Sequence, residues 1–289
     1  MIRRLKYHEI DFGKYSLCVQ HSLQNNFYAQ RRILDFLTKN SWELLVKDDY
    51  EAVMPVPVTK KWGVKLVFMP LFCQQLGIYS PEDNRELNEE FFKALIKKYR
   101  VVNYQFNEHN EFRQDFKVRK NYVVPIAEYA VLRKSYFKGR KSTVKTAQYL
   151  HYKETRNLED NLDFIKTHVK GLHKDKDIDK LLNYLNFLSK NEKLLLTQAF
   201  KEENLISCAL WIEEKEQNSL IALINDSHYK KDNGASFVID AFLQRYSNVK
   251  KTNFMGGSIR GIEVFFKSFG SQLHSYPIFT HPFWSRLIR

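Results

Sequence analysis

The pattern of hydrophobic and polar residues predicts alternating helices and strands along the chain. Apolar residues recur at helical spacing over residues 27–40. Three short apolar runs follow, separated by polar turns at 47–49 and 60–63, and we interpret them as an antiparallel meander of strands. The runs cover residues 42–46, 50–57 and 64–70.

A helix is predicted after this meander. Ser80 and Pro81 favour a helix start, because a hydroxyl caps free N–H groups and proline suits the first turn. The apolar residues that follow lie on one helical face. They are Leu87, Phe91, Phe92, Leu95, Ile96 and Tyr99. Residues 101–106 then return to a strand pattern.

The second half repeats this order of elements. Strands are predicted at 193–200, 205–212 and 219–229, followed by a polar break at 230–235 and a helix to about Tyr246. A short strand at 252–255, the sequence Gly256-Gly257-Ser258 and a second helix complete the series. That helix ends at Gly270, at a favourable position after a helix C-terminus.

The repeated order predicts an α+β fold of two lobes, each with a mostly antiparallel twisted sheet flanked by helices. Identity between the halves is negligible, so the repeat concerns the order of elements alone. We place the lobes at 1–150 and 151–289. Residues 127–192 are expected to be mostly helical and strongly basic, with the densest cationic run at 133–141.

The composition favours a folded protein with an anionic partner. Hydrophobic residues make up 44% of the chain, and 46 Lys and Arg residues against 33 Asp and Glu residues give a net charge of +13. Nucleic acid, CoA phosphates, a nucleotide-linked substrate and a membrane surface all fit this charge. Solubility alone explains it equally well.

Metal binding and secretion are not expected. The three cysteines are far apart without a CxxC pair, and the nine histidines form no HxH or HExxH motif. Free cysteines fit a cytoplasmic location. No apolar segment follows the basic N-terminus, and no apolar run approaches the roughly 20 residues of a membrane span, so neither a signal peptide nor stable membrane insertion is expected.

The break at 230–235 is the sharpest candidate for a phosphate-binding site. A helix N-terminus presents unpaired N–H groups and a partial positive charge. Gly234 and Ala235 allow close approach of a pyrophosphate, and Lys230 and Lys231 add charge. The alternative is an ordinary loop in which Asn233 caps the helix and Gly234 turns. The GxGxxG and P-loop patterns are absent.

Two further groups of residues are candidates for substrate binding. The adjacent amides Gln74 and Gln75 would point to opposite faces of a strand, so one of them could face a cleft. The cationic run at 133–145 suits phosphates of a nucleotide-linked substrate or of RNA. The alternatives are a β-bulge with a solvated glutamine and a solvated helix face. Lys267 is a candidate donor contact or a solvated residue.

The chain resembles the Fem-type (FemAB-like) transferases of the GNAT superfamily in several segments. In the first half these are residues 42–46, 50–57 and 70–78, and in the second half 233–236, 254–258 and 265–270. Residues 136–147 resemble the basic helix of the family at Lys141, Lys145 and Ala147. Ser142 and Thr143 replace the Arg and Asn that the family has there.

The resemblance implies two GNAT-like lobes and transfer of an acyl or aminoacyl group to an amine. The donor would be acyl-CoA, such as acetyl-CoA, or aminoacyl-tRNA, and the acceptor a small molecule, a peptide or a nucleotide-linked sugar. The compact region at 150–192 argues mildly against a tRNA-dependent cell-wall ligase, because those enzymes often carry a long helical arm.

The resemblance also assigns expected roles to residues. The donor would bind at Tyr229–Ser236 and Lys267, where the donor-contacting residues are Lys230, Lys231, Asn233, Gly234, Ala235 and Ser236. The acceptor would lie near Gln74, Gln75 and Tyr79. Arg140, Lys141 and Lys145 of the basic helix complete the expected acceptor site.

Transfer of this kind needs positioning, a weak base and an oxyanion donor, not a covalent nucleophile. Tyr229 or His228 is expected to be the acid or base, and the N–H groups around Asp226–Tyr229 are oxyanion candidates. Two alternatives are a non-catalytic binding module that kept the fold and a nucleic-acid-binding protein that uses residues 133–145.

Overall fold

The computed structural model describes residues 1–61, 63–172 and 174–283, and the chain forms two compact units. Unit 1 consists of Met1–Arg119 with Ser275–Arg289, and unit 2 of Lys120–His274. The strands β7 (Lys117–Val124) and β13 (Gln272–Thr280) carry the chain across the two boundaries. Residues 120–150, which the sequence division assigned to the first lobe, therefore pack in unit 2, and the C-terminal segment packs in unit 1.

Unit 1 is built on a sheet with the strand order β1-β2-β3-β4-β5. β1 to β4 pair antiparallel, and β4 and β5 pair parallel. The bounds are β1 Ile2–Leu5, β2 Trp42–Lys47, β3 Ala52–Lys61, β4 Val64–Val67 and β5 Arg100–Val101. The predicted meander is confirmed, although residue 62 of its second turn lies outside the described residues.

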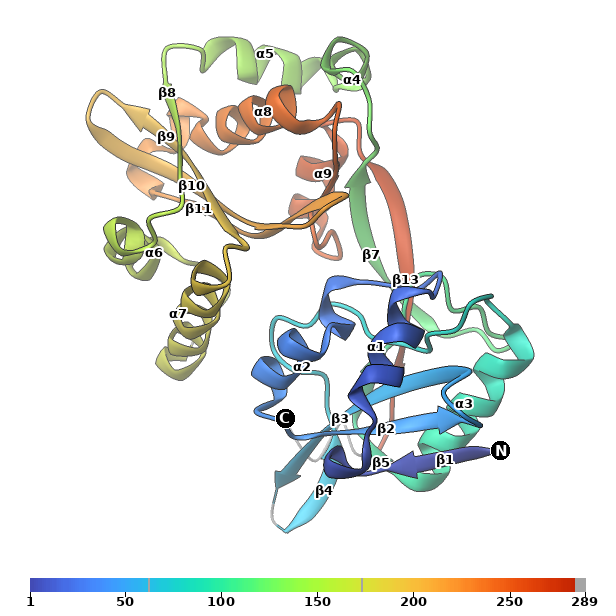
Figure 1. Cartoon of the computed structure of the whole chain (residues 1–289). Helices are drawn as coiled ribbons and strands as arrows, with labels where there is room; N and C mark the ends of the chain where they lie inside the picture. Colours follow the sequence, from blue (N-terminus) through green and yellow to red (C-terminus); the bar gives the residue numbers. More distant parts are fainter. Residues whose placement is uncertain (62, 173, 284–289) are drawn as a thin grey trace. The chain divides into compact units, whose positions relative to one another are not determined.

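Helices cover both faces of this sheet (Figure 1). The ring of Trp42 lies 5.2 Å from that of Tyr15, while the next residue, Glu43, accepts a hydrogen bond from Tyr99 at the end of α3. Neighbouring strand residues point to opposite faces, so α1 and α3 flank the sheet. The helices of unit 1 are α1 Phe12–Gln20, α2 Arg31–Thr38 and α3 Arg85–Lys98, with short 3₁₀ turns at Tyr7–Glu9 and Phe27–Ala29.

The predicted start of α3 at Ser80 is wrong. The helix begins at Arg85, after Asn84, whose side chain accepts from the N–H of Leu87 at 3.1 Å. Ser80 has other partners: its N–H donates to Gln24 and its hydroxyl to the carbonyl of Glu82. Asn84, four positions later, caps the helix instead, because the Ser80 hydroxyl is engaged by the carbonyl of Glu82.

The predicted strand at 101–106 is two separate strands. β5 ends at Val101, and β6 (Asn103–Gln105) pairs antiparallel with β13, with Tyr104 opposite Phe279. One extended segment therefore changes partner within a few residues. Periodicity predicts an extended backbone but not which strand receives its hydrogen bonds.

Unit 2 contains a sheet in the order β7-β12-β11-β10-β9-β8. Within it β11 and β12 pair parallel, and the other pairs are antiparallel. The bounds are β8 His151–Thr155, β9 Leu194–Lys201, β10 Asn204–Glu213, β11 Gln217–Asn225 and β12 Lys251–Asn253. β8 interrupts the region that the sequence indicated as mostly helical.

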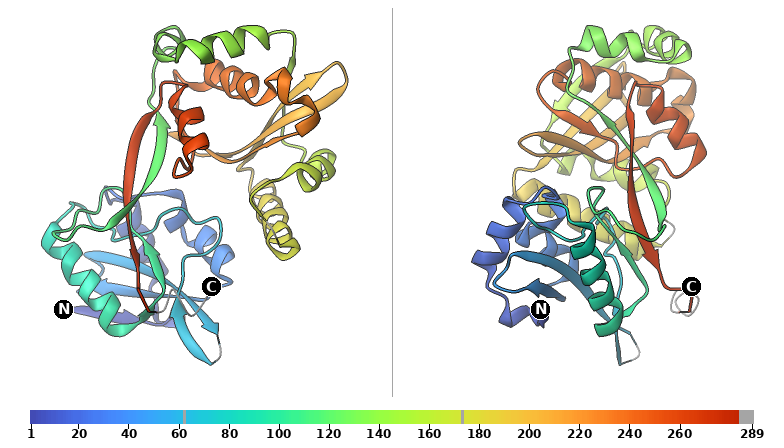
Figure 2. Two further views of the ribbon diagram at one scale, coloured as in Figure 1. Left: turned by 180° about the vertical axis from the view of Figure 1, so that it is seen from behind. Right: turned by 90° about the vertical axis from the view of Figure 1, so that its right-hand side faces the viewer.

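The helices of unit 2 lie on both sides of its sheet, as Figures 1 and 2 show. On one face Trp211 of β10 stacks on Phe242 of α8, with ring centroids 3.7 Å apart and planes 5° from parallel. On the other, Gln198 of β9 bonds Asn161 beside α6. The helices are α4 Tyr129–Ser135, α5 Lys138–Thr146, α6 Leu162–His168, α7 Asp175–Lys190, α8 Gly234–Tyr246 and α9 Arg260–Lys267.

Both units contain a parallel strand pair joined through a helix. In unit 1 this is β4–α3–β5, and in unit 2 it is β11–α8–β12. The repeated order of elements predicted from the sequence is therefore present. The repeat makes the two units comparable, and their differences indicate which of them suits a phosphate-bearing ligand.

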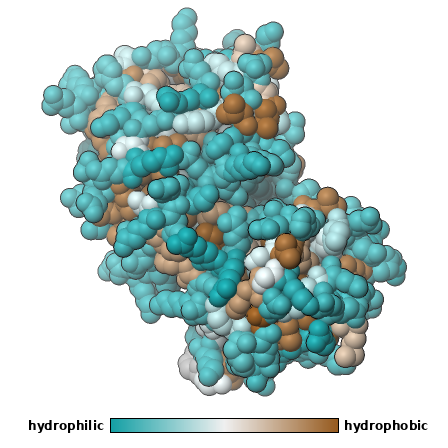
Figure 3. All heavy atoms as spheres, viewed as in Figure 1, coloured by the Kyte–Doolittle hydropathy of each residue, from teal (hydrophilic) through white to brown (hydrophobic). Residues whose placement is uncertain are grey.

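The surface seen in Figure 3 is mostly hydrophilic, with hydrophobic residues in separate small areas. No described helix is both long and apolar enough to cross a membrane. Cys18, Cys73 and Cys208 are free cysteines.

Candidate functional site

β11 and β12 pair at their first residues and then separate. The ladder joins Gln217–Ser219 to Lys251–Asn253. Beyond it, the N–H of Phe254 donates to Tyr122 of β7 at 2.9 Å, while β11 continues to Asn225 along β10. One edge of β11 over residues 220–225 therefore has no strand partner within the described part of the chain. We call this edge the open edge of β11.

Asp226 follows the last residue of β11 and places a carboxylate at the end of the open edge. Its Oδ1 accepts from the N–H of His228 at 2.9 Å and lies 2.8 Å from His228 Nδ1. Its Oδ2 lies 4.0 Å from Nε2 of His168. The backbone bond from His228 is the main reason why the pKa of Asp226 is lowered. His228 is 86% exposed, so its other ring nitrogen faces solvent.

Three of the N–H groups expected to form an oxyanion hole already have acceptors. Those of Asp226 and Tyr229 donate to the carbonyls of Ile206 and Asp226, and that of His228 to the Asp226 carboxylate. The open edge supplies other N–H groups, since alternate groups of a strand point to each side. Tyr229 is half-buried, packs against the core and has Lys201 Nζ 5.8 Å from its ring centroid.

The polar break consists of a 3₁₀ turn, Ser227–Asp232, followed directly by α8. Asn233 has φ of +60°, and its side chain donates to the carbonyl of Lys231, so it does not cap the helix. Lys230 and Lys231 are exposed. Gly234 is buried, and a Cβ there would lie 3.0 Å from Cβ of Ser207. Its role is to let α8 approach β10, and any approach to a phosphate is secondary.

The start of α8 is electrostatically suited to an anion. Its first turn contains no acidic residue, and Asp232 just before it accepts from Lys201 Nζ at 2.8 Å and from the Tyr149 hydroxyl. The bond from Lys201 is the main cause of the lowered pKa of Asp232. The equivalent start of α3 in unit 1 differs in carrying an acidic residue inside its first turn, Glu86, which pairs with Arg113, and it has Asp83 before it.

Arg140 is a structural link in unit 2. Its Nε donates to Ser268 Oγ at 2.8 Å, its Nη1 donates to Ser236 Oγ, and its guanidinium lies 4.5 Å from the ring centroids of Phe265 and Phe269. Burial lowers the pKa of Arg140 to about 10. Both Arg140 and Ser236, which the sequence indicated as ligand contacts, thus have partners inside the protein.

The other basic candidates are more accessible. Lys145 and Lys267 are exposed, and Lys267 adjoins Ser268. Lys141 is half-buried, and its Nζ donates to the carbonyl of Lys134 at 2.8 Å. These lysines remain candidate ligand contacts through their charge, with Lys141 the most constrained.

The glutamine candidates lie in unit 1 and belong to a buried network. Gln75 is 7% exposed and accepts from the N–H of Glu108 at 2.9 Å, while Gln74 is half-buried. Tyr79 is fully buried, and Asn26 donates to its hydroxyl. Tyr79 therefore has no surface for a substrate. The structure places these residues in a different unit from the α8 site.

Sequence reasoning missed the partners that hold the α8 site. Asp226 caps the 3₁₀ turn through the N–H of His228, and its position two residues before His228 is the local signal for this role. Lys201 and Tyr149 gave no signal, since they lie 31 and 83 residues from Asp232. No group of three or more described His, Cys, Asp or Glu residues is arranged to hold a metal ion.

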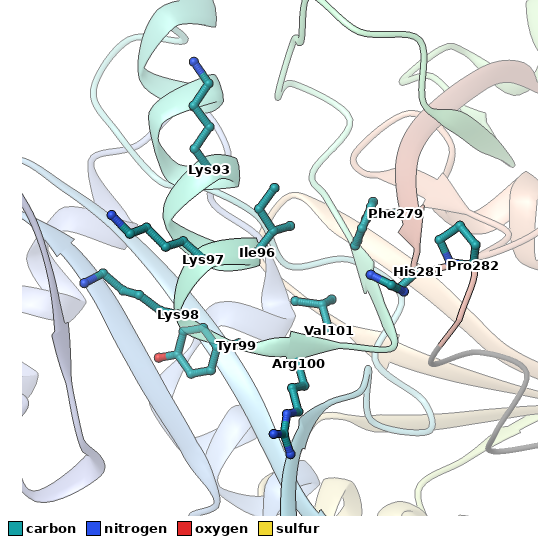
Figure 4. Close-up of a pocket in the computed structure, with 10 residues that line it drawn as sticks. All are labelled: Lys93, Ile96, Lys97, Lys98, Tyr99, Arg100, Val101, Phe279, His281 and Pro282. Carbon is teal, nitrogen blue, oxygen red and sulfur yellow. The ribbon is translucent and has the colours of Figure 1, made fainter.

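A separate groove lies on unit 1, between the end of α3 and β13 (Figure 4). Its volume is about 1020 Å³. Ile96 extends toward Phe279, whereas the side chains of Lys97 and Lys98 extend away from it. The charged and apolar residues therefore do not converge, and we do not assign this groove as the site of chemistry.

Known structures with the same architecture connect these features to a fold. No protein-family model and no curated protein matches this chain. The crystal structure of FemX superposes with a TM-score of 0.66 at 11% identity, covering 99% of each chain. The chain has the tandem GNAT-like fold of the Fem-type transferases.

Two other structures share this tandem fold. L-PGS from Bacillus licheniformis matches with a TM-score of 0.50 at 10% identity, over 92% of this chain and 90% of that one. A tandem GNAT protein from the clavulanic acid biosynthesis pathway matches with a TM-score of 0.50 at 8% identity, over 96% and 97%. At these identities the likeness concerns the fold, and activity is argued from the site.

Proposed function

We propose that this tandem GNAT-like protein is an N-acyltransferase whose donor binds in unit 2. The observation that carries the proposal is the open edge of β11, which is followed by a turn that contains Lys230 and Lys231 and then by the first turn of α8, which has no acidic residue. A phosphate-bearing donor fits both parts, with its phosphates at the helix start and its acyl arm along the strand. Acyl-CoA and aminoacyl-tRNA are the two donor classes considered.

The proposed donor contacts are backbone N–H groups and lysine side chains. N–H groups at Gly234 and Ala235 are the first of α8 and face the phosphates, with Lys230 and Lys231 adding positive charge. The open-edge N–H groups of β11 hydrogen-bond the acyl carbonyl oxygen. They stabilise the negative charge that this oxygen gains when the carbonyl carbon becomes tetrahedral.

His228 is the proposed general base. Asp226 holds its Nδ1, which leaves Nε2 to accept a proton from the acceptor ammonium. The neutral amine attacks the acyl carbon and forms the C–N bond, and the bond to the sulfur or oxygen of the donor breaks. The departing thiolate or alkoxide takes a proton from Tyr229 or from the protonated His228, and the second proton that the attacking nitrogen loses passes to the Tyr229 phenolate or to water.

The acceptor is an amine on a small molecule, a peptide or a nucleotide-linked sugar. Lys141 and Lys145 on α5 are proposed to contact anionic groups of the acceptor, and Gln74 and Gln75 remain weaker proposals because of their burial. The proposal leaves the acyl group open, because nothing in the geometry of the open edge selects its size.

The direct test measures donor binding to the full chain. Acetyl-CoA, longer acyl-CoAs and aminoacyl-tRNA are titrated by calorimetry and by thermal shift. The informative variant is Ala235→Asp, half-buried in the first turn of α8. An aspartate there stabilises the helix by about 0.3–1 kcal/mol but repels phosphate, so donor affinity should fall while the melting temperature is kept or raised.

A matched control is Lys97→Gln with Lys98→Gln on α3, which removes two positive charges from unit 1 and leaves α8 unchanged. Loss of donor affinity in Ala235→Asp but not in this control supports the proposal. Absence of binding to every donor by the folded protein refutes it. Donor binding without turnover on any amine identifies a non-catalytic module instead.

A further inference from the structure

The helices α4 and α5, with the residues that follow them, contain basic but no acidic residues. Residues 129–153 contain no acidic residue. Their cations are Arg133, Lys134, Lys138, Arg140, Lys141, Lys145 and Lys153. We call residues 129–146 the basic corner. This local excess of positive over negative charge is greater than the average excess along the whole chain, which has a net charge of +13.

The side chains of the basic corner divide into those that face the protein core and those that are exposed. Leu132 and Val144 are buried against the core, and Arg140 points inward to Ser236 and Ser268. The side chains of Lys134, Lys138 and Lys145 are exposed. The outer side therefore carries the lysines, while the residues that hold the helices in place face inward.

Two large apolar side chains of the basic corner are also exposed. Val131 is 60% exposed and Phe137 is 50% exposed. Phe137 sits between the helices, where its N–H donates to the carbonyl of Ser268 at 3.0 Å. The bond from Phe137 fixes the backbone between the two helices. The bond from Lys141 Nζ to the carbonyl of Lys134 links α5 to α4.

The basic corner is an outer layer of unit 2. Figures 1 and 2 agree that α5 covers α8 on the side away from the sheet. A half-exposed phenylalanine between two helices, with lysines within four residues on each side, suits a membrane surface. The phosphate layer of a bilayer attracts the lysines, and the ring enters the interface below it.

We propose that the basic corner docks the protein on a membrane that contains anionic phospholipids. The lysines bind the headgroups electrostatically, and Phe137 and Val131 insert at shallow depth. Binding is peripheral and reversible, since neither helix is long enough to span the bilayer. Docking through Lys134, Lys138 and Phe137 does not depend on the proposed chemistry, although Lys141 and Lys145 of the same corner are also the proposed acceptor contacts.

The ring pattern argues against single-stranded nucleic acid at this surface. Stacking platforms use successive accessible rings. Within the basic corner as described, Tyr136 is 3% exposed and Tyr129 is half-buried with its hydroxyl bonded to Asp240, which leaves Phe137 as its exposed ring; Tyr149, 53% exposed, lies after α5. Preferential RNA binding is therefore an outcome that would overturn the proposal.

The test is flotation of the full-length protein with vesicles. Neutral phosphatidylcholine vesicles are compared with vesicles containing about one-third phosphatidylglycerol. We expect binding to the anionic vesicles only, decreasing with salt. Lys134→Gln with Lys138→Gln should weaken it about fivefold for each lysine, and Phe137→Ser should weaken it independently of salt.

Matched variants separate a specific surface from net charge. Lys97→Gln with Lys98→Gln removes the same charge from α3, and Leu23→Ser removes a 60% exposed apolar side chain from unit 1. Both should bind as the parent does, and all variants should retain its melting temperature. No vesicle binding, equal loss in the controls, unchanged binding in the corner variants, or preference for a single-stranded RNA oligomer over the vesicles refutes the proposal.

Discussion

Arg140 and Ser236 join α5 to the first turn of α8 across 96 residues of sequence. The same guanidinium reaches Ser268 after α9, so three helices meet at one half-buried cation. A guanidinium loses hydration when it is buried, which is why its remaining hydrogen bonds matter. The arrangement explains why a residue resembling a substrate ligand acts as a support for the candidate site.

Removal of Ser268 should show this support. Ser268→Ala leaves Nε of Arg140 without its partner and should cost about 1–3 kcal/mol in the free energy of unfolding. In an Arg140→Met background the same change should cost only about 0.5 kcal/mol, since no buried donor remains. Urea unfolding of the four proteins measures the cycle. Equal costs in both backgrounds would contradict the link.

Two glycines should respond oppositely to alanine. Gly234→Ala places a Cβ 3.0 Å from that of Ser207 and 3.1 Å from Cδ1 of Ile206, so it should destabilise the protein by about 1–3 kcal/mol. Gly139 in α5 has open space around it, and Gly139→Ala should stabilise the helix by about 0.5–1 kcal/mol. Thermal unfolding distinguishes them, and the same sign for both would disprove the packing argument.

Stability should depend on pH through Glu214, in the turn between β10 and β11. Burial raises the pKa of Glu214 to about 7. The folded state therefore holds a proton that the unfolded chain releases near pH 4.3, and stability falls as pH rises from about 4 to 7. Glu214→Gln should match the parent at pH 4 and exceed it at pH 8, on the order of 1–3 kcal/mol.

Chemical denaturation at several pH values measures this difference. The control is Glu216→Gln, an exposed residue in the same turn. A Glu214→Gln advantage that is constant from pH 4 to pH 8 would show that burial of the charge is not its cause.

The proposed base makes a kinetic prediction. With a donor and amine that turn over, His228→Gln should lower kcat by about 10²–10⁴-fold with little change in donor affinity. Asp226→Asn keeps the local fold but removes the negative charge beside the imidazole, so activity should persist to lower pH. Rate profiles against pH test both. Full activity in His228→Gln would assign the proton transfer to another group.

Much of the fold was predictable because its signals are local. The periodicity around Trp42, the helix that starts at Gly234 and the stop at Gly270 each depend on neighbours a few residues away. Gly270 has φ of +73°, as a helix-ending glycine requires. The order of these elements was enough to indicate a duplicated architecture, even with negligible identity between the halves.

The features that the sequence did not predict are those held by residues far away in the sequence. β8 was read as helix, although His151 pairs with Phe200 on β9. Tyr79 looked like a ligand contact, but the fold buries it completely. Sequence spacing cannot indicate these partners, because a side chain acquires its surroundings only when remote strands and helices pack around it.

From its residues alone, the chain reveals its periodic segments, its basic charge and the likeness that links them to a tandem transferase fold. Packing then determines which candidates face solvent and which become supports. His228 stays exposed because it follows the end of a strand, whereas Arg140 turns inward to two hydroxyls brought from other helices. The reason is physical: backbone preferences are local, but burial and hydrogen-bond partners come from contacts across the whole unit.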